Sequence, residues 1–121
     1  MGEVVTVDRG AVVLVELNPT IGHEQHGVRP CIAVSDPAVN AEQRFPLIAV
    51  VPVTGTPGAG ALYPVLSPGA SGLVKESSAL IDHLRAIDKR RIRRIFGHVS
   101  APELTAIDQG LELFLGLGAT K

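Results

Sequence analysis

At 121 residues the chain is long enough for one domain that buries about two thirds of the surface its unfolded form exposes. A formal net charge of −1 excludes a uniformly basic protein, and an aromatic content of 3% argues against binding by many stacked rings. The single cysteine, Cys31, excludes an internal disulfide and fits a reducing cytosol. No apolar run approaches the roughly 20 residues of a membrane span, so we expect a cytoplasmic protein without membrane contact.

The N-terminal part of the chain is expected to form two strands separated by a long connection. Residues 1–8 are expected to be a short tail. A buried strand is predicted over residues 11–17, which are apolar except for Glu16, and a second strand over residues 30–35. The connection over residues 18–30 is longer than the roughly two to five residues of a usual hairpin loop and is rich in polar side chains. These features are typical of a functional loop.

The middle of the chain alternates short elements with loops rich in Gly and Pro. A helical turn is predicted over residues 38–43 and a strand over residues 47–53. Pro52 cannot donate a ladder hydrogen bond, so we expect this strand to bend or end there and to direct Thr54 outward. Two further strands are predicted, the first at a sheet edge: residues 62–67 and 73–82.

The segment over residues 83–94 fits both helical and strand spacing. We predict a strand up to about Ile87, a tight turn over residues 88–90 and a last strand near residues 95–99. Six of the eleven Lys and Arg residues are concentrated in it: Arg85, Lys89, Arg90, Arg91, Arg93 and Arg94. This density fits an anionic partner, or equally a solvated turn or strand edge.

The C-terminal part of the chain carries a clear helix signal. Ser100 and Glu103 have capping-box spacing, and they introduce a helix predicted over residues 102–115, which Gly116 ends. Many short strands followed by one capped helix predict a mainly β (α+β) fold, a small antiparallel barrel or half-barrel with a C-terminal α-helix.

Short motifs follow one another through nearly the whole chain. They are Arg9-Gly10, Asn18-Pro19-Thr20, Gly22-His23-Glu24-Gln25, Gly27-x-Arg29-Pro30, Ser35, Val51-Pro52-Val53-Thr54, Ile87-Asp88-Lys89-Arg90-Arg91 and the cap from Ser100 to Glu103. In this order they resemble the MazF/PemK (Kid) family of toxin ribonucleases. The resemblance implies a single toxin domain over residues 1–121.

The resemblance also implies the fold and the activity. The fold would be the SH3-like antiparallel barrel shared by MazF and the gyrase toxin CcdB, assembled as a homodimer. The activity would be metal-independent, sequence-preferring cleavage of single-stranded RNA, without a cofactor, blocked by a cognate MazE-like antitoxin. The ribose 2′-hydroxyl would attack the adjacent phosphate, leaving 2′,3′-cyclic phosphate and 5′-hydroxyl ends. Such chemistry needs groups that remove the 2′ proton, stabilise charge on the phosphate and protonate the leaving oxygen.

Arg29 and Thr54 match two catalytic positions of the family. The guanidinium fork of Arg29 suits two phosphate oxygens, so we predict that it stabilises charge. Its alternative role is an ion pair with a loop carboxylate such as Glu24. The hydroxyl of Thr54 can donate to a phosphate oxygen or hold Arg29 in place, and its alternative role is capping of a turn after the strand.

The loop sequence His23-Glu24-Gln25-His26 supplies candidates for proton transfer and RNA contact. His23 matches a histidine of the PemK/Kid branch, and an imidazole can act as acid or base near neutral pH. Glu24 is predicted to act as a base or to orient Arg29 or a histidine, while Gln25 and His26 are predicted to contact RNA. The alternative for both histidines is a solvated loop position. They are three positions apart, not four as in the zinc motif H-E-x-x-H, so no metal site is predicted.

Asp82, Arg85 and Lys89 are further candidates for RNA contact. Asp82 matches an acidic residue of the PemK/Kid branch, which has an arginine two residues earlier, where this chain has Leu80. The departure favours the pair at positions 29 and 54 over the alternative active site of that branch.

Two other functions compete with the toxin ribonuclease. One is a non-catalytic topoisomerase inhibitor like CcdB, or an SH3-like module that binds nucleic acid or peptide, because a fold alone does not determine function. A pure binder would not need the pair Arg29 and Thr54. The other is a folded but inactive member of the family, for which we find no sign in the sequence.

Overall fold

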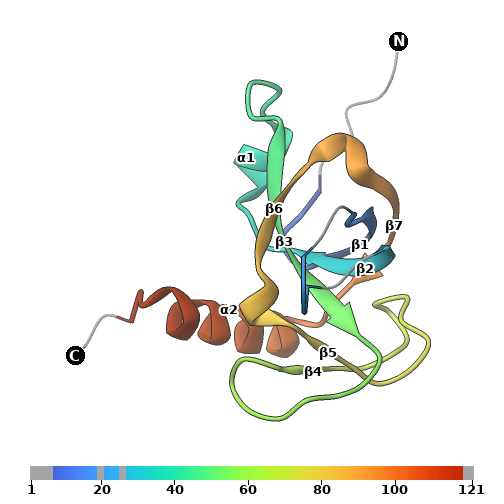
Figure 1. Cartoon of the computed structure of the whole chain (residues 1–121), viewed down its shortest axis with the longest axis vertical. Coiled ribbons are helices and arrows are strands. Elements are labelled where there is room, and N and C mark those ends of the chain that lie inside the picture. The colour runs from blue at the N-terminus through green and yellow to red at the C-terminus, as the bar shows by residue number, and fades with distance from the viewer. Residues whose placement is uncertain (1–6, 19–20, 25–26, 119–121) are drawn as a thin grey trace.

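The computed structural model describes residues 7–18, 21–24 and 27–118, and within them the chain forms a small curled sheet and a long C-terminal helix (Figure 1). The strands are β1 (Ala11–Glu16), β2 (Val28–Ala33), β3 (Leu47–Thr54), β4 (Val65–Leu66), β5 (Ser77–Ala79), β6 (Arg85–Asp88) and β7 (Ile92–His98). The helices are α1 (Pro37–Ala41), α2 (Ala101–Leu115) and the short 3-10 turns η1 (Ile81–His83) and η2 (Lys89–Arg91). The predicted mainly β fold with a C-terminal helix is confirmed.

The sheet is antiparallel, and β3 lies at its centre. The strand order is β4-β5-β3-β2-β1-β7, with β6 paired to β3 outside this path. The first half of β3 pairs with β6 as far as Val50↔Arg85, and its end pairs with β5 from Val53↔Ala79. Pro52 lies in the gap between these two partners, where a missing N–H costs little. The strand therefore does not end at Pro52 but continues to Thr54.

Alternate residues of β1 contribute to two hydrophobic cores. Val13 and Val15 belong to a core built from β1, β2, β3 and β6, and Val12 belongs to a second core that β1 shares with α2. Val7, which the sequence places in the N-terminal tail, is buried in the first core. Because both faces of β1 are covered, the strand is apolar throughout most of its length, as its sequence predicts.

The capping box of α2 is confirmed. The Ser100 hydroxyl accepts from the Glu103 amide at 3.3 Å, and the Glu103 carboxylate accepts from the Ser100 amide at 2.8 Å. The helix then packs on the second core through Ile107, which is fully buried. A Cβ at Gly110 would lie 2.8 Å from the carbonyl oxygen of Ala61, so the absence of a side chain lets the helix approach the loop before β4.

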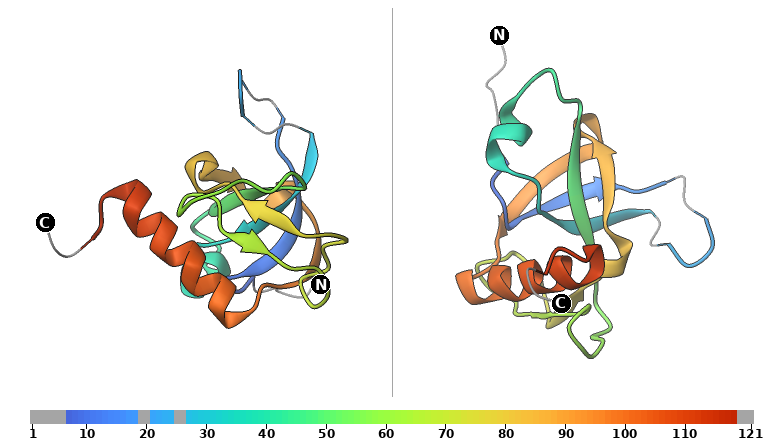
Figure 2. Two further views of the ribbon diagram at one scale, coloured as in Figure 1. Left: turned by 90° about the horizontal axis from the view of Figure 1, so that it is seen from below. Right: turned by 90° about the vertical axis from the view of Figure 1, so that its left-hand side faces the viewer.

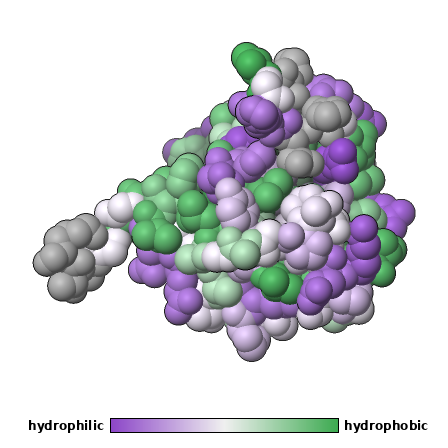
Figure 3. Space-filling model, turned by 60° about the horizontal axis from the view of Figure 1, so that its bottom comes forward, coloured by the Kyte–Doolittle hydropathy of each residue, from purple (hydrophilic) through white to green (hydrophobic). Residues whose placement is uncertain are grey.

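The C-terminal end of α2 extends beyond the sheet (Figure 2). Apolar side chains gather on the surface there (Figure 3), and four of them are exposed: Leu113, Phe114, Leu115 and Leu117. A cluster of exposed apolar side chains of this kind is typical of a surface that contacts another protein.

Four predicted strands have limits that differ by two or more residues in the structure, and the second of the chain, predicted over residues 30–35, is β2 at Val28–Ala33. The strand over residues 62–67 shortens to β4, because the chain before Pro64 forms a turn. The strand over residues 73–82 shortens to β5 and is followed by η1, whose 3-10 geometry no alternating pattern reveals. The last strand, β7, begins at Ile92 rather than near residue 95. We missed its first residues because the exposed arginines there interrupt the alternating pattern that predicts a strand.

Candidate active site

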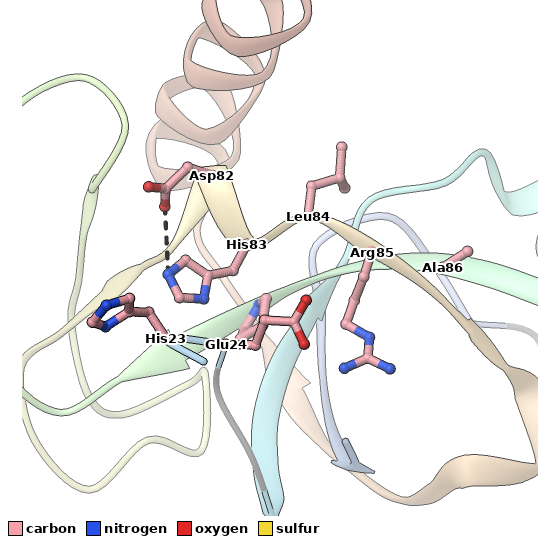
Figure 4. Close-up of a pocket in the computed structure, with 8 residues that line it drawn as sticks. His23, Glu24, Asp82, His83, Leu84, Arg85 and Ala86 are labelled. Carbon is pink, nitrogen blue, oxygen red and sulfur yellow. Dashed lines mark ion pairs between the residues drawn. The ribbon is translucent and has the colours of Figure 1, made fainter. Parts of the chain in front are cut away.

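A cavity of about 540 Å³ lies where η1 and β6 meet the connection between β1 and β2 (Figure 4). Imidazole and carboxylate groups reach it from both the connection and η1, and β6 adds a guanidinium. The lining residues are His23, Glu24, Pro52, Asp82, His83, Leu84, Arg85 and Ala86. Four predicted site residues, His23, Glu24, Asp82 and Arg85, are thus brought together from segments far apart in the sequence.

Tyr63, Asp82 and His83 form a row on the η1 side of the cavity. The hydroxyl of Tyr63 donates to Oδ2 of Asp82 at 2.8 Å, and Nε2 of His83 lies 3.7 Å from Oδ1 of the same carboxylate. The hydrogen bond to Asp82 raises the pKa of Tyr63, because the neutral phenol is the donor that the carboxylate accepts from. The side chains of Asp82 and His83 are 33% and 22% exposed, so both are held by the protein and remain within reach of a ligand.

Local hydrogen bonds shape the part of the connection that carries His23 and Glu24. The amide of Ile21 donates to Oε1 of Glu24 at 2.7 Å, and the amide of Glu24 donates to the carbonyl of Ile21 at 3.2 Å. Gly22 adopts a φ of 61° within this turn, a conformation that favours glycine. The turn brings His23 and Glu24 to the cavity, where Figure 4 shows them beside His83 and Arg85.

Two arginines support the start of the same connection. Arg85, in the cavity lining, donates to the carbonyl of Leu17 at 3.0 Å. Arg91 donates to the carbonyls of Glu16 at 3.3 Å and Asn18 at 2.5 Å. Guanidinium groups bound to backbone carbonyls hold the end of β1 in place, so these two arginines have structural partners within the chain.

Strand register brings Arg29 and Thr54 to the same end of the sheet. The β2–β3 ladder runs through Ala33↔Val50 and Ile32↔Val51 to Cys31↔Pro52. Two further steps along the same antiparallel register would place Arg29 opposite Thr54, with both side chains on the face of Cys31 and Pro52.

Both residues also have neighbours within the sheet. Pro52, two residues before Thr54, lines the cavity, so the end of the ladder adjoins it. Arg29 pairs with Val15 of β1, and Thr54 pairs with Ser78 of β5. The Thr54 hydroxyl accepts from the amide of Thr56 at 3.2 Å, which is the turn-capping contact weighed as the alternative role of this residue.

The residues from Lys89 to Arg94 are not in the cavity lining, although Arg91 reaches the start of the connection. Lys89 donates to the carbonyls of Val39 at 3.3 Å and Glu42 at 2.9 Å, so it holds the end of α1. Arg90 forms an ion pair with Asp88 at 2.9 Å. The guanidinium of Arg94 lies 4.5 Å from the centre of the Phe96 ring. Of the six concentrated cations, Arg85 lines the cavity, whereas Lys89 does not join the other predicted residues.

His83 and Tyr63 are site residues that the sequence did not indicate. We predicted a continuous strand through Asp82, in which neighbouring side chains point to opposite faces. The 3-10 turn η1 instead lets adjacent Asp82 and His83 both line one cavity. The one feature of the sequence that could have indicated His83 is its position directly after the carboxylate of Asp82. Gln25 and His26 lie outside the described residues.

The described residues give little support for a metal site or for a cysteine nucleophile. Among them, no group of three or more His, Cys, Asp or Glu side chains is arranged to hold a metal ion. Burial raises the pKa of the Cys31 thiol to about 12, so the neutral thiol prevails at neutral pH and the residue is not a nucleophile. No helix in the described part of the chain has the length and apolar character to cross a membrane.

The half-barrel, the capped C-terminal helix and the polar cavity at one end define a small, mainly β protein, and comparison with known proteins identifies its family. Residues 8–115 match the model of the PemK-like, MazF-like toxins of type II toxin-antitoxin systems. The chain belongs to this family, and the predicted resemblance is confirmed.

The chain is also similar to individual members of the family. It is 36% identical over 115 residues to Endoribonuclease MazF9 of Mycobacterium tuberculosis, covering 90% of this chain and 96% of that protein. The crystal structure of MazF (Form-I) from Deinococcus radiodurans is 29% identical, with a TM-score of 0.79 over 93% of this chain and 98% of that one. The MazE-MazF structure (Form-II) from the same organism is 28% identical, with a TM-score of 0.74 over 94% and 99% of the two chains. The barrel of the MazF type is therefore confirmed.

Proposed function

We propose that this chain, a MazF-type endoribonuclease toxin, cleaves single-stranded RNA without a metal ion and at preferred sequences. The ribose 2′-hydroxyl attacks the adjacent phosphorus, and the products carry 2′,3′-cyclic phosphate and 5′-hydroxyl ends. The family membership and the 36% identity to Endoribonuclease MazF9 support the enzyme class. The chemistry is supported by one observation above all: the β2–β3 register, which, continued two steps beyond Cys31↔Pro52, would set Arg29 opposite Thr54 at the sheet end beside a cavity with two imidazoles.

Each of the four proposed catalytic residues has a separate role in the reaction. Arg29 binds the phosphate through its guanidinium fork and stabilises the negative charge that develops on it. Thr54 donates its hydroxyl to a phosphate oxygen, a role that its acceptor contact with the Thr56 amide leaves open. His23 takes part in proton transfer from the side of the cavity that the connection forms, and Glu24 orients its neighbours.

RNA binding is assigned to the rest of the cavity and its loop. Asp82 and Arg85 contact the substrate where they line the cavity, and Gln25 and His26 extend the contact along the connection. Lys89 is the weakest of the proposed RNA contacts, because its ammonium already serves two carbonyls of the α1 segment.

The toxin is proposed to act in the cytoplasm as a homodimer that a MazE-like antitoxin inhibits. The exposed apolar end of α2 supports burial against another protein chain. The 28% identity to the MazF of the MazE-MazF structure supports the kind of antitoxin. Light scattering of the purified chain tests the assembly, and a monomer at micromolar concentration would contradict it.

The deciding experiment incubates the purified chain with a long single-stranded RNA in EDTA and maps the new ends. Discrete cuts with 5′-hydroxyl ends are expected, with single-stranded DNA left intact. Arg29→Ala is expected to lower the cleavage rate about 10²- to 10³-fold, the usual effect of removing one group that stabilises transition-state charge.

Arg90→Ala is the matched control, because it removes the same charge from a side chain that is 91% exposed and paired with Asp88. Its cleavage rate should stay within about twofold of wild type. Two RNAs of different composition that both remain intact would exclude the ribonuclease and favour a binding module.

A further inference from the structure

The side chain of His83 has the environment of a proton-transfer group, although no motif singled it out. It is 22% exposed, it lines the cavity, and its Nε2 faces the carboxylate of Asp82 at 3.7 Å. Asp82 is in turn held by the hydroxyl of Tyr63 at 2.8 Å. An imidazole aligned by an anchored carboxylate is the arrangement in which one ring nitrogen keeps the proton and the other accepts one.

We propose that His83 is the general base of the RNA cleavage reaction and that Asp82, anchored by Tyr63, is its positioning residue. The inference rests on the proposed ribonuclease function. The negative charge of Asp82, 3.7 Å from Nε2, attracts the proton of the neutral ring to that nitrogen, and the lone pair of Nδ1 is then available to the substrate. Figure 4 shows that the second nitrogen of the ring points away from Asp82.

The step balances within the cavity. Nδ1 of His83 takes the proton from the ribose 2′-hydroxyl as O2′ forms a bond to phosphorus. The bond between phosphorus and O5′ breaks, and the electron pair goes to O5′. That oxygen takes a proton from the imidazolium form of His23, which the connection brings to the same cavity. Exchange with water then restores both histidines for the next cycle.

Several charged groups surround the base. Asp82 lies on its own turn, Glu24 and His23 come from the connection, Arg85 comes from β6, and Tyr63 acts through Asp82. The two carboxylates stabilise a positive charge on the ring, whereas Arg85 and a protonated His23 oppose it. The guanidinium of Arg85 donates to the carbonyl of Leu17, whereas the carboxylate of Asp82 forms an ion pair with the His83 ring at 3.7 Å.

The test measures RNA cleavage in EDTA as a function of pH for the full chain and for His83→Gln. In this variant kcat is expected to fall about 10²- to 10⁴-fold, with KM within about threefold of wild type. The plot of cleavage rate against pH is expected to be bell-shaped for the wild type and to lose its acidic limb in the variant, because that limb reports deprotonation of the base. Asp82→Asn, which leaves the imidazole in place, is expected to lower kcat about tenfold or more and to displace that limb. A purely structural role for Asp82 would leave the limb where it is.

His98→Gln is the matched control. His98 lies on β7 in a different cavity, lined also by Ser71 and Glu103, and its Nδ1 is 2.7 Å from the carbonyl of Val99. This control should keep the wild-type rate and pH profile. If His83→Gln does the same while the wild type cleaves RNA, the assignment of the base is wrong and the ribonuclease stands. If the wild type leaves all RNA intact, both proposals fall.

A second measurement does not depend on whether the variant folds. Long-range ¹H–¹⁵N spectra of the wild-type chain report which ring nitrogen of a neutral histidine carries the proton. His83 is expected to carry it on Nε2. A proton on Nδ1 of the neutral ring would overturn the proposal.

Discussion

The cavity at η1 and the basic stretch from Lys89 to Arg94 both hold charged side chains, but the protein uses them differently. In the cavity, Asp82, His83 and Arg85 are partly exposed and converge on open space. In the basic stretch, Lys89 and Arg91 donate to backbone carbonyls, and Arg90 is paired with Asp88. The concentration of charged residues from Lys89 to Arg94 therefore serves mainly to stabilise the fold. The site, in contrast, contains fewer charged residues, and they come from segments far apart in the sequence.

Within this comparison, the largest expected effect distinguishes two arginines of the same sequence cluster. Arg85→Ala removes a cation from the cavity lining and the hydrogen bond to the Leu17 carbonyl. We expect kcat/KM for RNA to fall about 100-fold, or about 2.7 kcal/mol. Arg94→Ala removes an equal charge over the Phe96 ring and is expected to change kcat/KM less than about threefold. Equal losses in the two variants would mean that the whole stretch binds RNA.

A smaller effect is expected at Lys89, and it concerns stability. Lys89→Met keeps the aliphatic stem and removes the hydrogen bonds to the carbonyls of Val39 and Glu42. We expect the free energy of unfolding to fall by about 1–2 kcal/mol, with cleavage of RNA within about twofold of wild type.

Urea titration measures the stability change. Arg93→Met, an exposed position of β7, is the matched control and should shift stability by less than about 0.5 kcal/mol. A weaker salt dependence of RNA binding in Lys89→Met, at unchanged stability, would instead make Lys89 a phosphate contact, as the sequence suggested.

The smallest effect is the acid sensitivity that Asp88 adds. Hydrogen bonds from Arg90 lower the pKa of this carboxyl to about 2, from 3.8. A carboxyl with a lowered pKa stabilises the fold above its unfolded value, near pH 4, and loses this contribution as the pH falls toward 2.

Urea midpoints at pH 5 and pH 2.5 measure the loss for wild type and for Asp88→Asn. The variant should lose less stability between these two values. Because the Arg90 side chain is 91% exposed, solvent screens the pair and the difference is expected to be small; an identical loss in both proteins would show that the pair with Arg90 contributes nothing.

Local patterns predicted the elements whose signals are short-range. The capping box at Ser100, the αL glycine after α2 and the apolar strands β1 and β3 all follow from residues within a few positions of each other. The limits of β4, β5 and β7 did not follow, because each depends on its partners in the sheet. η1 was missed because a 3-10 turn of three residues leaves no periodic pattern.

The sequence by itself determined the family, the mainly β class and the candidates Arg29, Thr54, His23, Glu24, Asp82 and Arg85, because these depend on motifs and on the order of residues. Only the tertiary structure decided that Asp82 and His83 share a cavity with the connection, that Tyr63 anchors the carboxylate, and that Lys89 holds the α1 segment. The reason is physical: a side chain becomes part of a site through the neighbours that long-range packing brings to it, and no spacing along the chain records them.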